Sequence, residues 1–330
     1  MPANPIRPTI SLTEPGKRHG FLKLPHSRND SAWGAQMIPL TVIQGAPGPT
    51  ALLTGANHGD EYEGPIALQA LAHELTAEAV TGRLIIVPFL NFPAFRAGTR
   101  VSPIDGVNLN RAFPGRPDGT VSQKIADYFA RTLVPMADLV VDFHSGGRTL
   151  DFLPFACAHY LDDAAQQEAC VAAARAFNAP FTLMLREIDA VGMYDTEVEA
   201  QGKIFVTTEL GGGGTATARS ARIARRGLRN VLVHARLLPG TPEVEASRLL
   251  DMPDDDCYHT APESGLVEPL VDLGGTVARG DALARIWPAD RSGAAPVTVV
   301  AQRGGILAAR HFPGLTQLGD TLAVVAVASD

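Results

Sequence analysis

The stretch that decides the fold of this chain is Thr54-Gly55-Ala56-Asn57-His58-Gly59-Asp60-Glu61-Tyr62-Glu63-Gly64. It follows an apolar run, residues 50–53, that predicts a buried strand, and it leads into residues 66–75, which predict a helix. His58 and Glu61 therefore stand at a strand-to-helix turn. Imidazole and carboxylate both bind Zn²⁺, and a catalytic zinc takes three protein ligands and keeps one position open. We expect His58 and Glu61 to be two of those ligands.

The candidate for the third ligand is His144, which ends an apolar run that begins at residue 139 and is followed by Ser-Gly-Gly. A histidine just past the end of a buried strand lies where open α/β sheets place their active sites. Alone it would more often be a structural histidine, but its pairing with the His58/Glu61 turn favours a metal site. Strand alternation puts Asp142 on the same face, where its carboxylate can fix the tautomer of a ligand imidazole.

Strand and helix patterns alternate on both sides of these residues. Apolar runs at 84–90, 139–143 and 204–209 predict strands, and residues 121–133, 164–177 and 220–238 have helical periodicity. This alternation is typical of an α/β layer structure with a largely parallel sheet. Residues 1 to about 45 add a strand-rich entry segment, with short apolar runs at 19–24 and 38–43.

Glu209 is the candidate general base. It ends the predicted strand 204–209 and precedes the glycine run Gly211 to Gly214. A partly desolvated carboxylate beside Zn²⁺ is suited to take a proton from water and to return it. The glycine run lacks the spacing of a phosphate-binding loop, so we expect it to supply flexible backbone beside the base. The alternative is that Glu209 is only a cap or a rim residue.

The segment from Asn91 to Thr120 is rich in Pro, Gly and Arg and shows no periodicity. A loop of this length within a compact domain is usually functional. Arginine presents a planar fork of donors that matches a carboxylate, and asparagine adds an amide donor. Asn110 and Arg111 are therefore candidates to bind a substrate carboxylate, and Arg100 to stabilise the oxyanion of a tetrahedral intermediate.

Helical patterns disappear near Thr241, and short β-type runs separated by glycines follow. They predict a small β-sandwich or barrel. We divide the chain into a catalytic domain at 1–245 and a β-domain at 257–330. The β-domain resembles the lipoyl/biotinyl-like sandwich, but no lysine follows Lys203, so a carrier role is excluded. We expect a structural or interface-forming module.

The bulk properties exclude several classes of protein. The formal net charge is −7 and there is no Lys/Arg run, which argues against nucleic-acid binding. The arginines between Arg219 and Arg229 are interpreted as a solvated helix face. Three cysteines without paired spacing indicate reduced thiols. The N-terminus has no apolar segment typical of a signal peptide, and no apolar run is long enough to span a bilayer. We expect a cytoplasmic protein and leave homo-oligomerisation open.

The motifs together resemble a known family. His58-Gly59-Asp60-Glu61, Asn108-Leu109-Asn110-Arg111-Ala112-Phe113-Pro114-Gly115, Asp142-Phe143-His144 and Glu209 follow the order and approximate spacing of the succinylglutamate desuccinylase/aspartoacylase family. The resemblance covers residues 50 to 235. It implies a zinc carboxypeptidase-like mixed sheet flanked by helices, and one zinc ion held by His58, Glu61 and His144. It also implies substrate binding by Arg100 and Asn110/Arg111, Glu209 as general base, and amide hydrolysis of a small N-acyl amino acid. Aspartoacylase has a shorter spacer after the arginine that corresponds to Arg100.

The chain length and the β-domain look most like the bacterial branch of this family that hydrolyses N2-acetyl-L-2,4-diaminobutyrate in ectoine breakdown. Such a substrate carries a cationic side-chain amine. Its potential partners lie between residues 189 and 199, and they are Asp189, Asp195, Glu197 and Glu199. Solvated loop acids are an equally good interpretation of these four. The other hypotheses are a desuccinylase or aspartoacylase-type deacylase, a carboxypeptidase, and a non-catalytic binding protein.

Overall fold

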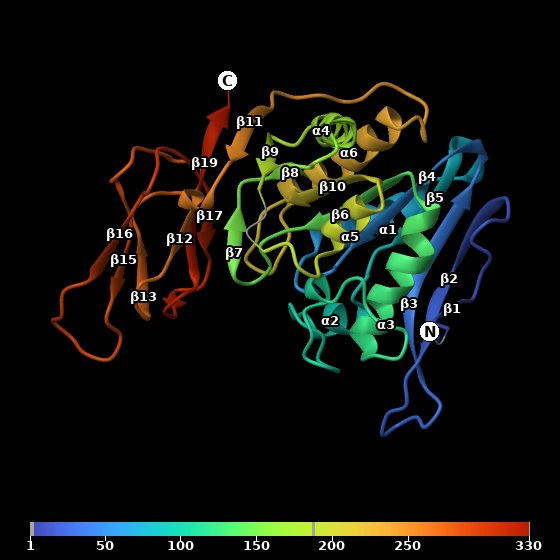
Figure 1. Ribbon diagram of the computed structural model, residues 1–330, viewed down its shortest axis with the longest axis horizontal. Helices are drawn as coiled ribbons and strands as arrows, with labels where there is room; N and C mark the ends of the chain where they lie inside the picture. The colour runs from blue at the N-terminus through green and yellow to red at the C-terminus, as the bar shows by residue number, and fades with distance from the viewer. Residues whose placement is uncertain (1–2, 187–188, 330) are drawn as a thin grey trace.

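The computed structural model describes residues 3–186 and 189–329. The outermost residues of the two predicted domains, 1–2 and 330, lie outside the described residues. A large mixed sheet runs through the molecule, with helices on both of its faces and a second small sheet near the C-terminus (Figure 1). The expected fold class, a mixed α/β sheet flanked by helices with a C-terminal β-structure, is confirmed.

The large sheet has fifteen strands, and its main path runs β1-β2-β3-β5-β4-β6-β10-β8-β9-β11-β19-β17-β14. Two further strands, β7 and β12, pair with β17 and β19 respectively. In chain order the strands are β1 (Arg7–Pro8), β2 (Gly16–Pro25), β3 (Ala35–Gln44), β4 (Ala46–Gly55), β5 (Thr81–Val87), β6 (Leu139–His144), β7 (Leu150–Phe152), β8 (Phe155–His159), β9 (Phe181–Leu185), β10 (Ile204–Glu209), β11 (Arg248–Met252), β12 (Tyr258–Thr260), β14 (Thr276–Val277), β17 (Gly305–His311) and β19 (Thr321–Ser329).

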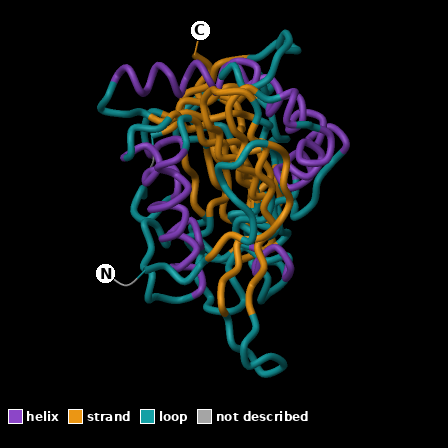
Figure 2. The backbone as a smooth tube through the Cα atoms, turned by 90° about the vertical axis from the view of Figure 1, so that its right-hand side faces the viewer, coloured by secondary structure: helices purple, strands orange, loops and turns teal. Residues whose placement is uncertain are grey.

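Apolar side chains alternate between two cores because successive residues of a strand point to opposite faces. Leu53 and Val141 pack in one core with α1, α4 and α6. Leu52 and Val140 pack in the other core with α3 and α5. Figure 2 shows the strands as a central layer between helices. The helices are α1 (Glu63–Glu74), α2 (Phe92–Ala97), α3 (Val121–Tyr128), α4 (Ala164–Phe177), α5 (Tyr194–Ala200) and α6 (Ala218–His234).

The middle of the sheet is parallel, and this arrangement positions the site. Strands β5, β4, β6 and β10 run parallel in that order, so their C-terminal ends meet at one edge. The expectation of a largely parallel sheet holds for this middle. Strands β8, β9 and β11 are parallel to one another, but β8 pairs with β10 antiparallel, so these three run opposite to the middle. The expectation is wrong for the N-terminal strands β1, β2 and β3, which form an antiparallel meander, and for the C-terminal strands.

The C-terminal strands form two sheets rather than one isolated module. β13 (Gly265–Pro269), β15 (Ala282–Trp287), β16 (Val297–Val300) and β18 (Leu315–Thr316) make a four-stranded antiparallel sheet. β19 instead pairs with β11, and β17 pairs with β7, so these strands continue the large sheet. Figure 1 shows this part at the far end from the N-terminal strands. The described residues after α6 contain no α-helix, only a 3₁₀ turn at Asp255–Cys257.

The segment 91–120, expected to lack regular structure, contains α2 and a 3₁₀ turn at Leu109–Arg111. Asn91 caps α2 by accepting a hydrogen bond from the Ala94 backbone, and Pro93 lies in its first turn. Gly98, in the left-handed region at φ 61°, ends it. A polar cap, an early proline and a terminal glycine are start and stop signals visible in the sequence, but the helix is too short to show periodicity.

Candidate metal centre and active site

The turn after β4 brings His58 and Glu61 to the C-terminal edge of the sheet. Its backbone is fixed by hydrogen bonds from Leu90 to Gly55 and from Gly59 to Thr99. Gly59 lies so close to α2 that a Cβ atom there would be 2.0 Å from the Ala94 carbonyl carbon. The glycine between His58 and Glu61 is therefore required by close packing.

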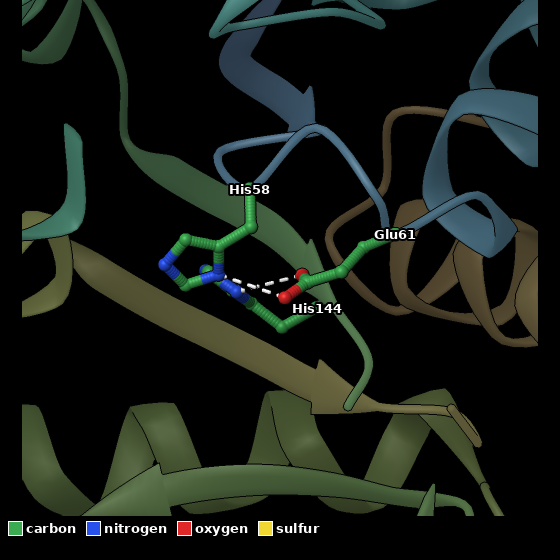
Figure 3. Close-up of side chains that lie close together, drawn as sticks. All are labelled: His58, Glu61 and His144. Atoms are coloured by element: carbon green, nitrogen blue, oxygen red, sulfur yellow. Dashed lines mark hydrogen bonds and ion pairs between the residues drawn. The ribbon is translucent and has the colours of Figure 1, made fainter. Parts of the chain in front are cut away.

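His58, Glu61 and His144 come together at this edge, although His144 arrives from a separate strand (Figure 3). One ligand atom from each side chain lies within 4.8 Å of the others. Glu61 lies between the two imidazoles, with Oε1 2.7 Å from His58 Nδ1 and Oε2 3.1 Å from His144 Nδ1. All three side chains are at least nine-tenths buried. Two imidazoles and a carboxylate form the ligand set of zinc hydrolases.

The far nitrogen of each imidazole has its own partner. His58 Nε2 lies 3.2 Å from Asn108 Oδ1, and His144 Nε2 lies 2.9 Å from Asp142 Oδ2. Each of these oxygens can accept a hydrogen bond from Nε2–H. Nδ1, which faces Glu61, would then be the atom that binds a metal once its own proton is displaced. The contact expected between Asp142 and a ligand imidazole is confirmed. Asn108 was missed, although it opens the Asn-Leu-Asn-Arg motif.

A buried network supports Asp142 in turn. Its Oδ1 accepts a hydrogen bond of 2.6 Å from Thr54 Oγ1, and its Oδ2 accepts one of 3.3 Å from Asn57 Nδ2. Sequence reasoning assigned no role to Thr54 or Asn57, although Asn57 directly precedes His58. The carboxylate that orients His144 is thus itself held by two donors, which fixes the geometry of the group before any ligand binds.

The charges within the group are strongly coupled. Burial opposes ionisation of Glu61, but His58 and His144 outweigh it and hold the Glu61 pKa well below its usual range. Burial lowers the pKa of His58. It also opposes the charge of His144, yet the carboxylates of Asp142 and Glu61 raise the His144 pKa well above its usual range. A divalent cation here would displace a proton from the imidazoles and meet a carboxylate that is already ionised.

Glu209 lies beside this group because β10 pairs with β6 in a register that sets Glu209 opposite His144. Burial, followed by the charge of Glu61, raises the pKa of Glu209 to about 8. Its Oε2 is buried and has no hydrogen-bond partner among the described residues. A carboxylate that takes up a proton near neutral pH and has an unengaged oxygen has the properties of a general base.

The glycine run after Glu209 is packed tightly, and the expectation of flexible backbone there is wrong. Gly211 accepts hydrogen bonds from the backbone of Gly146 and Phe152. A Cβ atom at Gly212 would lie 1.9 Å from the Leu150 carbonyl oxygen. The glycines allow close approach between this run and the loop after His144.

Arg100 reaches the group from the loop after α2. Its Nη1 donates a hydrogen bond of 3.3 Å to His58 Nδ1 and lies 3.8 Å from Glu61 Oε1. The side chain is 43% exposed, so the guanidinium is open to a ligand. A guanidinium in this position beside the histidine–glutamate group can donate hydrogen bonds to a ligand oxygen.

Asn110 and Arg111 line the same cavity. Asn110 Oδ1 accepts hydrogen bonds from Asn57 Nδ2 at 3.1 Å and from the backbone N–H of Tyr194 at 3.0 Å. Because a backbone N–H can only donate, the orientation of the Asn110 amide is fixed and its Nδ2 remains a donor. Arg111 lies 3.9 Å from Asp189 and is partly exposed. Both side chains can therefore donate to a substrate carboxylate.

One cavity of about 240 Å³ contains all seven candidate residues. Its far wall comes from β8 and β9 and from the C-terminal strands, which contribute Tyr258, Ala308, Thr321 and Val324. Of the four acids between 189 and 199, Asp195 alone lines this cavity. A larger hollow of about 530 Å³ beside α6 holds the arginines between Arg219 and Arg229 and shares no lining residue with the cavity. Four of those five arginines are exposed, as expected of a solvated helix face.

Known proteins resemble this chain over most of its length. Residues 47–235 match the Succinylglutamate desuccinylase/Aspartoacylase catalytic domain. The N-alpha-acetyl-L-2,4-diaminobutyric acid deacetylase of Halomonas elongata is 56% identical, over 98% of this chain and 95% of that protein.

No helix among the described residues has the length and apolarity needed to cross a bilayer.

Two solved structures share the whole fold. The product-bound ectoine utilization protein EutE (DoeB) from Ruegeria pomeroyi is 64% identical, with a TM-score of 0.98 over 99% of this chain and all of that one. A succinylglutamate desuccinylase from Silicibacter sp. TM1040 is 63% identical, with a TM-score of 0.97 over the full length of both. The chain therefore belongs to the succinylglutamate desuccinylase/aspartoacylase family of amide-hydrolysing deacylases.

Proposed function

We propose that this protein is a zinc-dependent deacetylase that hydrolyses N2-acetyl-L-2,4-diaminobutyrate, a step of ectoine degradation. The observation that carries the zinc chemistry is the convergence of His58, Glu61 and His144 beside Glu209 in one cavity. The substrate is inferred from the relatives, because the 56% identical protein is named as the deacetylase of that compound and the 64% identical one as an ectoine utilization protein.

The donor set fits zinc. His58 Nδ1, His144 Nδ1 and the Glu61 carboxylate would hold the ion, and Asn108 and Asp142 would keep the imidazoles oriented. Three N and O ligands with room for a fourth position favour a catalytic zinc. When bound, zinc supplies Lewis acidity toward the acyl carbonyl and lowers the pKa of water.

The protein groups carry the rest of the reaction. Glu209 takes a proton from water, and the water oxygen forms a bond to the acyl carbon. Arg100 donates to the acyl oxygen as negative charge develops on it. The C–N bond then breaks, and Glu209 returns the proton to the leaving amine, so that acetate and the free amino acid are released.

Asn110 and Arg111 hold the substrate carboxylate during this reaction. Asn110 is fixed by Asn57 and by the start of α5, so it presents a preorganised donor. Arg111 adds charge and a second pair of donors. We place the reaction in the cytoplasm, since Cys170 and Cys257 are buried thiols that form no disulfide among the described residues, as expected in a reducing compartment.

The test is a substrate panel with purified protein and added Zn²⁺, in which the free amine is measured. The panel contains N2-acetyl-L-2,4-diaminobutyrate, N-acetyl-L-aspartate, N2-succinyl-L-glutamate and a short peptide. We expect the highest kcat/KM for the diaminobutyrate derivative and loss of activity with a chelator. A preference for either dianionic substrate would refute the substrate assignment, and hydrolysis of the peptide alone would favour a carboxypeptidase.

A further inference from the structure

The cavity contains one carboxylate that the reaction does not use. Its lining carboxylates among the described residues are Glu61, Glu209 and Asp195. Glu61 faces the two imidazoles, and Glu209 lies opposite His144 on the neighbouring strand. Asp195 comes from a different element, the first turn of α5, and is only 6% exposed.

Asp195 is buried without a cationic partner. Its Oδ1 accepts hydrogen bonds from the Thr196 backbone N–H at 2.5 Å and from Thr196 Oγ1 at 3.2 Å. Among the described residues no arginine, lysine or histidine makes an ion pair with it. Arg111, which also lines the cavity, has Asp189 as its acidic partner at 3.9 Å. A buried carboxylate without a counter-charge carries a desolvation cost that a bound cation would offset.

The start of α5 is anchored to the residues proposed to hold the substrate carboxylate. The Tyr194 backbone N–H donates to Asn110 Oδ1 at 3.0 Å, and the Phe113 backbone N–H donates to the Gly192 carbonyl at 3.0 Å. The Phe113 and Tyr194 rings stack with centroids 4.7 Å apart. Asp195 follows Tyr194 directly, so its position relative to Asn110 is fixed. An amino acid held at Asn110 by its carboxylate would therefore share the cavity with the Asp195 carboxyl group.

The other acids of this segment are engaged elsewhere. The Asp189 side chain is 67% exposed beside Arg111. Glu197 accepts a hydrogen bond of 2.8 Å from Gln201 Nε2, and Glu199 lies 2.8 Å from His159 Nδ1. None of these three lines the cavity.

We propose that Asp195 binds the ammonium group of the substrate side chain and so selects N-acylated diamino acids over neutral and acidic ones. This inference rests on the proposed deacetylase function. Asn110 and Arg111 would bind the negatively charged carboxylate of the substrate, and Asp195 would bind a positive charge on its side chain. The cavity would thus recognise two opposite charges on one short substrate. It favours a zwitterionic diamino acid and repels a second carboxylate.

The test compares N2-acetyl-L-2,4-diaminobutyrate with N-acetyl-L-norvaline, in which a methyl group replaces the ammonium group at equal length. For wild type we expect a higher kcat/KM with the diamino substrate. The Asp195→Asn variant should lower the ratio of the two kcat/KM values by about tenfold or more, mainly through KM, because a charged hydrogen bond is lost. The matched control Glu197→Gln removes a carboxylate from the same helix outside the cavity and should leave the ratio unchanged.

Equal losses on both substrates in Asp195→Asn would show a purely structural role and overturn the inference. Equal kcat/KM for the two substrates in wild type would also overturn it, while the deacetylase function would stand. Wild-type protein that hydrolyses neither would refute the proposed function itself. If Asp195→Asn fails to fold, inhibition of wild type by L-2,4-diaminobutyrate and by L-norvaline decides the question. Stronger inhibition by the diamino acid is expected, and equal inhibition overturns the inference.

Discussion

Replacement of Glu209 by glutamine removes a charge that the folded protein holds at a cost. Burial and the neighbouring Glu61 raise the Glu209 pKa from its ordinary 4.5 to about 8. Because the folded-state pKa is the higher one, the folded protein binds more protons than the unfolded chain between these values. The free energy of unfolding of metal-free wild type therefore falls, through this group, as pH rises from about 4.5 to about 8. Glutamine has no such charge.

The size of the effect follows from the same pKa values. One pKa unit corresponds to about 1.4 kcal/mol, so metal-free Glu209→Gln should exceed wild type in stability by up to roughly 5 kcal/mol above pH 8, with little difference near pH 4.5. Urea unfolding of chelator-treated protein across this pH range measures it. The control is Glu197→Gln, which removes a carboxylate that does not line the cavity. A Glu209→Gln difference that is constant or shrinks with rising pH would refute the assignment of a buried, destabilised carboxylate.

The same variant separates stability from catalysis. With zinc restored, Glu209→Gln should bind the metal as wild type does, because Glu209 is not in the proposed ligand set. Its kcat should fall by about 10² to 10⁴, the contribution of a general base. Retention of wild-type turnover would exclude Glu209 as the base, whatever its effect on stability.

Three further predictions concern the surroundings of the site. Asp142→Asn should weaken zinc binding about 10- to 100-fold in competition with a chromophoric chelator, and unchanged affinity would show that His144 does not need its partner. Arg111→Met should raise KM for the acetylated amino acid about tenfold or more but hardly affect N-acetyl-1,3-diaminopropane, which lacks the carboxylate; equal effects would argue against a carboxylate contact. Gly59→Ala should lower the free energy of unfolding, measured by chemical denaturation, by more than about 3 kcal/mol because its Cβ would overlap Ala94. The control Gly314→Ala has open space around it and should lower this free energy by less than about 1 kcal/mol. Similar values for the two variants would contradict the packing argument.

Site residues that lie at the ends of strands could be predicted from the sequence. His58, His144 and Glu209 each follow or end an apolar run, and the parallel middle of the sheet brings such ends together. Their partners could not be located in this way. Asn108 meets His58 across fifty residues of chain, and no local pattern encodes that contact.

The C-terminal strands show a second limit of sequence reasoning. Their glycine-separated apolar runs predict β-structure, which the structure contains. The runs carry no information on which strand pairs with which, and β19 pairs with β11 while β17 pairs with β7. As a result the expected module also lines the cavity, through residues such as Tyr258 and Val324. Its division from the rest of the chain at 245–257 stays a proposal.

For the four acidic residues between 189 and 199, burial in the structure separates side chains that the sequence could not tell apart. In the sequence Asp189, Asp195, Glu197 and Glu199 were equivalent, and solvated side chains explained them equally well. Only three-dimensional packing distinguishes Asp195, which is 6% exposed and lines the cavity, from Asp189, whose side chain is 67% exposed outside it.

The central claim is that His58, Glu61 and His144 hold a catalytic zinc, and metal analysis of a ligand variant tests it most directly. Wild type and the His58→Ala/His144→Ala double variant are loaded with Zn²⁺, desalted and measured by elemental analysis, with a folded state checked by circular dichroism. We predict one zinc per chain for wild type and none for the double variant. Stoichiometric zinc that persists in the folded double variant would contradict the assignment of the site.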